Sequence, residues 1–440
     1  MTAFPLAIKV WQDLPAAERQ ALLQRPALSQ KPDLTRAVSG IIDAVRRDGD
    51  AALRRLTEKY DGVALESIRV PDADMAAAPS RLGPGVLPAL ERARQQIETF
   101  HKAQRPVDLD LEVSPGVRCM RQSRPIARVG LYVPGGTAPL PSTVLMLAVP
   151  AALAGCPGRV LCTPPREDGS VDPAILAAAS LCGIEQVYRV GGAQAVAAMA
   201  FGTASVPAVD KIFGPGNAFV TEAKVQAARD PAGAAADMPA GPSEVLVLAD
   251  GQADPAFVAA DLLSQAEHGP DSQCVLVTDS RELIDATAVA LAEQLERLSR
   301  SEYAALSLSH SFAVLTADTA SSLEFSNAWA PEHLIIQTRD AAELVPHVQN
   351  AGSVFLGPWS PESVGDYASG TNHVLPTYGW TRSFSGLSLD SFLKQITFQQ
   401  LTPGGLQDIG PVVEELAALE GLDAHKNAVS LRLAAIGGPE

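Results

Sequence analysis

The sequence predicts an α/β protein with two parallel-sheet domains and an active-site cleft between them. From Ile126 to about Leu356, short runs rich in Val, Ile and Leu alternate with Ala-rich segments of helical pattern. This alternation is typical of parallel strands joined by helices, and it comes in two successive blocks. The length of 440 residues also favours about two to three domains over one core. Two Rossmann-like domains in succession satisfy these three observations.

The segment before the first block has a helical pattern and no evident chemistry. Apolar residues from Leu34 to Val45 recur at helical spacing and would share one face. The pattern breaks at Asp48–Asp50, a second helix continues through Tyr60, and a third runs from about Val86 to Phe100. We interpret these helices as packing elements.

Each block contains its own strands and helices. In the first block, strands are expected at Arg128–Val133, Arg159–Thr163, Gln186–Val190 and Lys211–Phe213, with helices at Thr143–Ala154, Pro173–Cys182 and Gln194–Phe201. In the second, strands are expected at Glu244–Leu248, Cys274–Thr278, Phe312–Leu315, His333–Gln337 and Ser353–Leu356, with helices at Pro255–Gln265, Arg281–Leu298 and Thr319–Asn327. Ligands in such sheets gather at the carboxyl ends of the strands.

The alternation stops after Trp380. A strand-like run at Phe392–Phe398 is followed by two helical segments, Val412–Leu419 and Ala424–Ile436. This tail is too small to hold a core of its own. We therefore expect it to pack on another domain or on another subunit.

Composition and charge exclude several classes of protein. The formal net charge of −16 argues against a surface for nucleic acid or for an anionic membrane, because both need clustered Lys and Arg. The most apolar stretch, Thr143–Ala154, is too short to span a membrane, and Met1–Lys31 resembles neither a secretory signal nor a transit peptide. The five cysteines lack CxxC spacing, so reduced and mostly buried thiols are expected. A cytoplasmic protein fits these features.

Three loops rich in glycine follow strands of the first block: Pro134–Pro139, Gly191–Gln194 and Phe213–Asn217. Glycine lets backbone N–H groups approach a phosphate, and a helix that begins behind the loop adds a favourable dipole. None of the loops is a GxGxxG motif, and each alone is more often a tight turn. Three of them in one block favour nucleotide binding.

Gln265 and His268 end a helical segment of the second block. Residues three apart lie on one helix face, so one turn could present an amide oxygen and an imidazole to a metal ion. Such a pair alone is more often a solvated helix end. The topology leaves open which edge of the sheet it occupies.

Glu332 and His333 are adjacent at the start of a buried strand. A carboxylate and an imidazole suit proton transfer near neutral pH, although an isolated pair is more often a solvated acid beside a capping histidine. Pro331 biases Ala330 towards an extended conformation. The loop Asp237–Glu244, which enters this block, is interpreted alone as an interdomain hinge.

A polar cluster, Gly365–His373, follows the last strand, and so many small and polar residues have no obvious packing use. Asp366 lies in this cluster, and His425 begins the last helix. Together with Gln265 and His268 they would offer oxygen and nitrogen ligands to a divalent ion such as Zn²⁺, with open positions for substrate.

These motifs, in this order, resemble the histidinol dehydrogenase family. The resemblance spans nearly the whole chain and rests on Tyr132–Gly136, Val190–Ala195, Phe213–Asn217, Asp237–Glu244, Ser264–Gly269, Pro331–Leu334 and Gly365–Pro376. It implies an enzyme that uses NAD to oxidise L-histidinol to L-histidinal and then to L-histidine. It also implies a homodimer with shared active sites.

The resemblance assigns roles to residues of this chain. It implies one Zn²⁺ per subunit, with Gln265, His268, Asp366 and His425 as ligands, and His425 reaching the site of the partner subunit. It implies Glu332 and His333 as the acid/base pair. The substrate contacts would be Ser243, His373 and Glu420 together with the zinc ligands and His333, and the NAD contacts would be Tyr132, Gln194 and Asn217.

The expected domain boundaries follow from the same comparison. Residues 1–30 form an N-terminal extension, and residues 31–130 together with 244–385 form a larger α/β domain that carries the zinc and catalytic residues. Residues 131–243 form a second α/β domain that contacts NAD, and residues 386–440 form the tail. The two extensions are expected to pack on the partner subunit.

Three alternatives remain at this point. A related zinc- and NAD-dependent dehydrogenase could act on another hydroxyl substrate, and a zinc hydrolase would also place a Glu beside a His/Asp metal site. A metal-binding protein without catalytic activity would leave Glu332 and His333 without a role. Retention of His373, Glu420 and His425 favours histidinol as the substrate, and the glycine-rich loops argue against a hydrolase.

Overall fold

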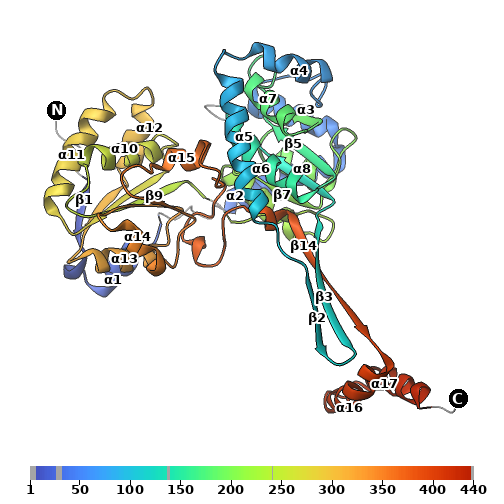
Figure 1. Ribbon diagram of the computed structural model, residues 1–440. Coiled ribbons are helices and arrows are strands. Elements are labelled where there is room, and N and C mark those ends of the chain that lie inside the picture. The colour runs from blue at the N-terminus through green and yellow to red at the C-terminus, as the bar shows by residue number, and fades with distance from the viewer. Residues whose placement is uncertain (1–5, 26–31, 136–138, 240, 438–440) are drawn as a thin grey trace. The chain divides into compact units, whose positions relative to one another are not determined.

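The computed structural model describes residues 6–25, 32–135, 139–239 and 241–437 (Figure 1). The chain divides into two compact units, one of Met1–Gln104 with Ile126–Phe392 and the other of Arg105–Pro125 with Leu393–Glu440. The predicted α/β class with parallel sheets is confirmed. Among the described residues, no helix is both long and apolar enough to cross a membrane.

The first sheet of the larger unit has the strand order β6-β5-β4-β7-β8, and its strands are parallel. The strands are β4 (Arg128–Tyr132), β5 (Gly158–Thr163), β6 (Gln186–Arg189), β7 (Lys211–Phe213) and β8 (Ala235–Ala236), and the helices between them are α6 (Pro141–Ala154), α7 (Pro173–Leu181), α8 (Gly192–Phe201) and α9 (Ala218–Arg229). All predicted elements of this block are confirmed. Helix α9 and strand β8 were not predicted.

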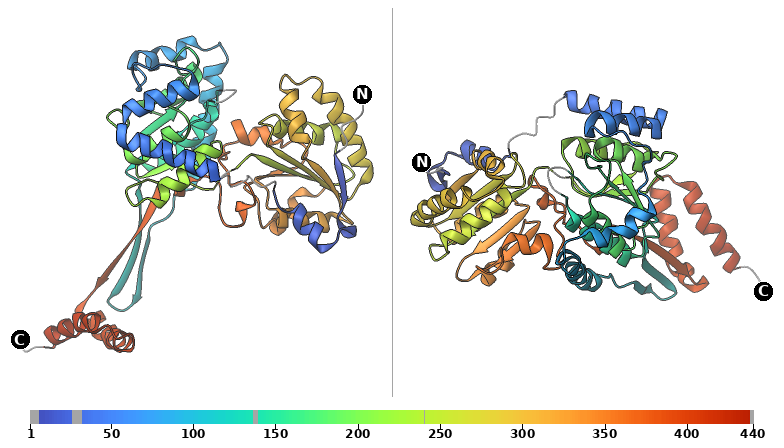
Figure 2. Two further views of the ribbon diagram at one scale, coloured as in Figure 1. Left: turned by 180° about the vertical axis from the view of Figure 1, so that it is seen from behind. Right: turned by 90° about the horizontal axis from the view of Figure 1, so that it is seen from above.

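The early helices pack on this first sheet, as Figures 1 and 2 show in blue around the green strands. They are α2 (Pro32–Asp48), α3 (Asp50–Asp61), α4 (Asp72–Ala77) and α5 (Val86–Ala103). The apolar face of α2, including Val38 and Val45, is buried in one core with residues of α8 and α9. The apolar stripe of α2 faces the Ala-rich side of α8, and the expected grouping of residues 31–130 with 244–385 stays a prediction.

The second sheet of this unit is also parallel, with the order β1-β11-β10-β9-β12-β13. Its strands are β1 (Ala7–Val10), β9 (Glu244–Ala249), β10 (Gln273–Thr278), β11 (Phe312–Leu315), β12 (His333–Gln337) and β13 (Ser353–Leu356). Its helices include α1 (Ala16–Leu22), α10 (Pro255–Ala266), α11 (Arg281–Leu295), α12 (Ser301–Leu308), α13 (Thr319–Trp329), α14 (Ala341–Leu344) and α15 (Glu362–Tyr367). Strand β1, which was not predicted, makes the N-terminal extension an edge strand of this sheet.

Register in the second sheet places the catalytic candidates together. Val245 of β9 pairs with His333 of β12, so Glu244, the first residue of β9, and Glu332, which precedes β12, are neighbours. Parallel strands begin at a common edge. The candidate residues thus lie at the amino ends of these strands, whereas the ligands of such sheets are expected at the carboxyl ends.

The second unit contains an antiparallel sheet and two packed helices. The order is β14-β3-β2, with β2 (Leu109–Ser114), β3 (Val117–Pro125) and β14 (Leu393–Leu401). Helices α16 (Pro403–Leu419) and α17 (Asp423–Ile436) pack against each other, and the Thr402 hydroxyl caps α16 by accepting from the Gly405 N–H at 3.1 Å. The predicted strand and two helices of the tail are confirmed, whereas its partner hairpin was not predicted.

Candidate active site

The candidate site lies where four segments of the larger unit meet. The end of α10 supplies Gln265, the starts of β9 and β12 supply Glu244 and His333, and α15 supplies Glu362 and Asp366. Helix α15 packs against α10. Glu244 and His333 begin two strands and the other residues lie on two helices, so their meeting depends on tertiary structure.

The predicted pair Gln265 and His268 is brought together, but not by a continuous helix. Helix α10 ends at Ala266, and the His268 N–H bonds the Gln265 carbonyl at 3.1 Å in a final tight turn. The Gln265 side-chain amide is oriented here so that its nitrogen faces acceptors and its oxygen faces a donor. In this orientation the buried nitrogen lies 3.3 Å from the carbonyl oxygen of Glu244. The amide oxygen then accepts from His268 Nδ1 at 2.9 Å. His268 Nε2 lies 3.9 Å from Asp366 Oδ2.

Glu362 joins this group and was missed by the sequence analysis. Its Oε1 lies 3.1 Å from the Gln265 amide nitrogen, and its buried Oε2 has no hydrogen-bond partner within the described part of the chain. Ligand atoms of His268, Glu362 and Asp366 lie within 4.8 Å of one another. The signal in the sequence was the spacing of Glu362 and Asp366, four residues apart on one short helix.

These residues fit a divalent cation such as Zn²⁺. They offer carboxylate, amide and imidazole donors without a thiolate, which suits an ion that keeps positions open for substrate. Burial raises the pKa of Asp366 to about 7, and burial followed by the charge of Asp366 raises the pKa of Glu362 well above its usual range. A bound cation would favour the charged form of both carboxylates.

His333 is buried with one ring nitrogen fixed. Its Nδ1 lies 3.1 Å from the carbonyl oxygen of Glu244, and because a carbonyl only accepts, Nδ1 carries the proton and Nε2 is the basic atom. Burial lowers the pKa of His333 to about 3. Nε2 lies 3.9 Å from Asp366 Oδ1, so a neutral base faces the candidate metal site.

Glu332 is also buried, next to His333. Its Oε2 accepts a hydrogen bond from the Glu244 N–H at 2.8 Å and lies 3.6 Å from His333 Nδ1. Burial raises the pKa of Glu332 well above its usual range, and the nearby Glu244, Glu362 and Asp366 carboxylates raise it further. The structure therefore brings the predicted acid/base pair together at one buried point.

The turn before Glu332 differs from expectation. Ala330 was expected to be extended before Pro331, yet it has φ 58° and ψ 68° in the left-handed region. It ends helix α13, and its N–H bonds the Ser326 carbonyl at 2.8 Å. Pro331 disfavours the right-handed helical conformation for Ala330, and the left-handed conformation that ends the helix also avoids it.

The remaining predicted substrate contacts lie in different places. Ser243 directly precedes Glu244, and His373 Nδ1 donates to the Asp366 carbonyl at 2.9 Å, while its Nε2 lies 3.1 Å from Thr143 Oγ1. Glu420 and His425 belong to the second unit, at the end of α16 and on α17, and both are exposed. Their substrate and metal contacts stay predictions.

The predicted nucleotide loops follow the carboxyl ends of β4, β6 and β7. The Tyr132 hydroxyl accepts from the Gly192 N–H at 3.0 Å, and Gln194 is buried in the first turn of α8. Asn217 caps α9 by accepting from two backbone N–H groups, at 3.1 and 3.2 Å, a signal that could have revealed the missed helix. Of the first loop, residues 136–138 lie outside the described residues.

This edge of the first sheet fits a nucleotide. A Cβ added to Gly135 or to Gly191 would lie 2.6 Å from Pro164, so both positions need glycine for close approach of the backbone. A cavity of about 600 Å³ lies beside them, lined by Gly135, Pro164 and the charged side chains Asp61, Arg166, Glu167, Asp168 and Asp172. Helices α8 and α9 begin at this edge, where their N–H groups suit phosphates.

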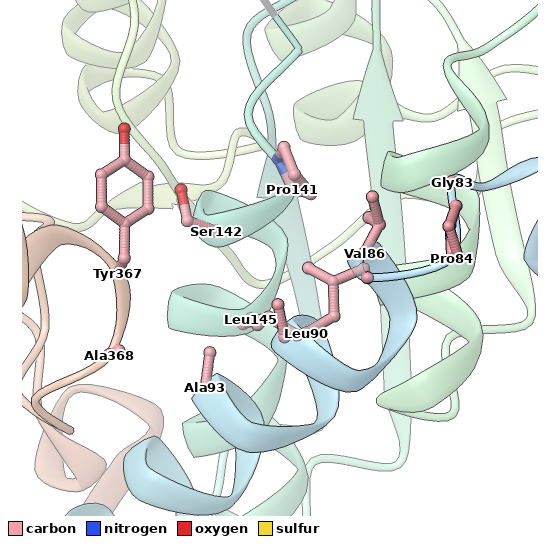
Figure 3. Close-up of a pocket in the computed structure, with 12 residues that line it drawn as sticks. Gly83, Pro84, Val86, Leu90, Ala93, Pro141, Ser142, Leu145, Tyr367 and Ala368 are labelled. Carbon is pink, nitrogen blue, oxygen red and sulfur yellow. The ribbon is translucent and has the colours of Figure 1, made fainter.

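A second cavity, of about 680 Å³, is apolar (Figure 3). Helix α5 contributes Val86 and Leu90, helix α6 contributes Leu145, and Tyr367 and Ala368 follow Asp366 in the chain. Figure 3 shows the Tyr367 ring beside the start of α6. The cavity therefore adjoins the segment that carries a candidate metal ligand.

Comparisons with known proteins agree over the whole chain. The family model described as histidinol dehydrogenase matches residues 23–433. The chain is 56% identical over 424 residues to histidinol dehydrogenase of Vibrio parahaemolyticus, covering 96% of this chain and 97% of that protein. It is 57% identical over 426 residues to histidinol dehydrogenase of Pectobacterium atrosepticum, covering 97% and 96%.

A solved structure shows the same similarity. The crystal structure of histidinol dehydrogenase from Elizabethkingia anophelis matches with a TM-score of 0.95 at 46% identity and covers 100% of both chains.

Proposed function

The chain belongs to the histidinol dehydrogenase family of oxidoreductases, and from this premise we propose that it is a zinc-containing enzyme that uses NAD to oxidise L-histidinol to L-histidine through L-histidinal. The observation that carries the proposal is the buried pair Glu332 and His333 beside a cluster of oxygen and nitrogen ligands. A four-electron oxidation needs two proton acceptors with different tasks, and this pair offers them.

Substrate would be held by the cluster around Asp366. Gln265, His268 and Asp366, with His425, would hold Zn²⁺, which when bound supplies positive charge for the imidazole and amino nitrogens of histidinol. The neighbouring Glu362 supports a cation at this place, because its buried Oε2 has no hydrogen-bond partner among the residues that the structure describes. Ser243, His373 and Glu420 are proposed as further substrate contacts.

The first oxidation converts the alcohol to the aldehyde. His333 Nε2 takes the hydroxyl proton while the carbinol C–H bond breaks, and Tyr132, Gln194 and Asn217 would hold the NAD to which the hydride is transferred. The lowered pKa of His333, about 3, keeps the imidazole neutral at neutral pH, so Nε2 carries no proton before the step. The hydrogen bond from Nδ1 to Glu244 fixes the tautomer that this step needs.

The second oxidation requires hydration of the aldehyde. Glu332 removes one proton from water, the oxygen adds to the aldehyde carbon, and the carbonyl oxygen gains a proton to give the hydrate. Loss of a second hydride to a second NAD and of a proton then yields the acid. Glu332 lies beside His333 at the same buried point, and its ionised form can take the proton from water.

A homodimer would complete the site through the second unit. Its helices expose apolar side chains, among them Val412, Leu416, Leu419 and Leu431, and such faces mark contacts between chains. We propose that Glu420 and His425 enter the site of the partner subunit.

The deciding experiment measures NADH formation with L-histidinol and separately with L-histidinal. The expected result is two NADH per histidinol, loss of activity after chelation and recovery after addition of Zn²⁺. Oxidation of another alcohol in preference to histidinol would point to the related dehydrogenase, and zinc-dependent hydrolysis without NADH would overturn the proposal.

A further inference from the structure

Both catalytic groups hydrogen-bond the backbone of one residue, Glu244. Its N–H donates to Glu332 Oε2 at 2.8 Å, and its carbonyl accepts from His333 Nδ1 at 3.1 Å. The Glu332 N–H in turn lies 3.3 Å from Glu244 Oε1. The carboxylate of each of these two acids thus contacts the backbone N–H of the other where the neighbouring strands begin. A shift of Glu244 would therefore move both catalytic groups.

Arg25 fixes this residue from the N-terminal segment. Its Nε and Nη2 donate to the two carboxylate oxygens of Glu244 at 2.8 and 2.7 Å, and the two side chains are only 4% and 1% exposed. Buried two-point pairs of this kind are strong and directional. Arg25 therefore determines where the Glu244 carboxylate lies.

The same guanidinium also holds the turn that leads to Glu332. It donates to the carbonyls of Trp329 at 2.6 Å and of Ala330 at 3.3 Å, and it stacks on the Trp329 ring with 3.6 Å from Cζ to the ring centroid. The turn includes the left-handed Ala330. One side chain thus connects the N-terminal segment with both strand ends of the site.

We propose that Arg25 is a positioning residue for Glu332 and His333, and that it acts through Glu244. Arg25 also compensates a carboxylate that is buried beside the catalytic carboxylate of Glu332. The inference rests on the proposed function for the roles of the two catalytic groups. The arrangement of Arg25, Glu244 and the turn does not depend on that function.

The test is a double-mutant cycle of Arg25→Met, Glu244→Gln and the two together. Arg25→Met leaves a buried carboxylate without its cation, so oxidation of L-histidinal should slow by about tenfold or more, the order expected for a displaced catalytic group. In the double variant the neutral Gln keeps its backbone contacts, so activity should recover most of this loss. Arg25→Lys keeps the positive charge but loses the two parallel hydrogen bonds of the guanidinium, so its activity should lie between those of the wild type and Arg25→Met.

Arg19→Met is the matched control. Arg19 lies in the same N-terminal segment, stacks on Trp11 and bonds only the carbonyls of Leu14 and Gln12 in the described contacts. It should change the melting temperature without changing kcat for either substrate. Equal loss of kcat in Arg19→Met and Arg25→Met, or losses that multiply in the double variant, would overturn the proposal.

A second readout does not need activity. In metal-free protein with ¹⁵N-labelled histidine, the His333 resonances, assigned with His333→Asn, should report the Nδ1–H tautomer in the wild type and lose it in Arg25→Met. An unchanged tautomer in Arg25→Met would refute the positioning role. If the wild type fails to reduce NAD with histidinol, the proposed function fails, while this measurement still decides the role of Arg25.

Discussion

His333 shows how one side chain is prepared for proton transfer by burial and one hydrogen bond. We expect His333→Asn to lower kcat for histidinol by about 10²–10⁴-fold, the range for loss of a general base. Zinc content should be unchanged, because the ring nitrogens of His333 are not among the proposed ligands. Metal analysis beside the assay checks both statements, and loss of the metal would refute the assigned role.

Glu332 is expected to matter more for the aldehyde. Glu332→Gln keeps an oxygen that can accept from the Glu244 N–H but cannot take a proton from water. Oxidation of L-histidinal should fall by about 10²-fold or more, and oxidation of the alcohol should fall less. Separate steady-state measurements with the two substrates give the comparison, and equal losses would contradict the division of labour.

Asp366 makes metal binding depend on pH. Its folded pKa of about 7 lies above the unfolded value of about 4. Its contribution to the stability of metal-free protein is therefore fully present below about pH 4 and is lost as pH rises through about 7. Bound Zn²⁺ favours the ionised carboxylate, so Zn²⁺ should raise the melting temperature more at pH 8 than at pH 5.5.

Because Zn²⁺ favours the ionised carboxylate of Asp366, the affinity of the protein for the metal should also depend on pH. Below pH 7, affinity should fall by up to about tenfold per pH unit for each proton displaced. Chelator competition across this range measures the slope, with Asp366→Asn as the comparison. A slope of zero in the wild type would show that Asp366 is already ionised.

At this scale the sequence indicated which residue types matter and could not show all their contacts. Gln265 and His268 were found from their spacing. Glu244 was not identified as a site residue, because it contacts Glu332 and His333 through its backbone N–H and carbonyl. Such contacts do not depend on the type of side chain, so the sequence does not indicate them. Arg25 was missed because its partner lies 219 residues away in the chain.

Among the elements, the loop after β7 depends on glycine. Gly214 has φ 124°, and a Cβ there would lie 2.1 Å from the Tyr132 carbonyl oxygen. Gly214→Ala should reduce the free energy of unfolding by roughly 1–3 kcal/mol and raise KM for NAD. Gly40→Ala in α2, where a Cβ meets nothing within 4 Å, should instead add about 0.5–1 kcal/mol. Denaturant titration of both variants checks the contrast.

Most helices and strands could be predicted from the sequence, but which strands pair with each other could not. Apolar runs located the strands of both sheets except β1 and β8, because buried parallel strands are apolar on both faces. Strand order is set by long-range pairing, so nothing local indicated that Ala7–Val10 would join β11. For the same reason the spacing at α10 could not show that the site lies at amino ends.

At the scale of the whole molecule, we expect the second unit to contribute His425 to the proposed metal site. If His425 is a ligand from the partner subunit, His425→Asn should lower the affinity for Zn²⁺ by about tenfold or more, with the fold intact. His347→Asn, a change at another exposed histidine, is the control. Metal affinity equal in both variants would remove His425 from the ligand set.

The two sheets of the larger unit present opposite ends of their strands to chemistry. The glycine loops follow the carboxyl ends of β4, β6 and β7, whereas Glu244, Glu332 and His333 stand at the amino ends of β9 and β12. The backbone proposed to bind the nucleotide and the backbone that carries the proposed acid/base pair are therefore separate parts of the chain. Substitutions that change the accepted alcohol can accumulate in one part while the coenzyme loops stay as they are, so the two preferences are free to diverge independently.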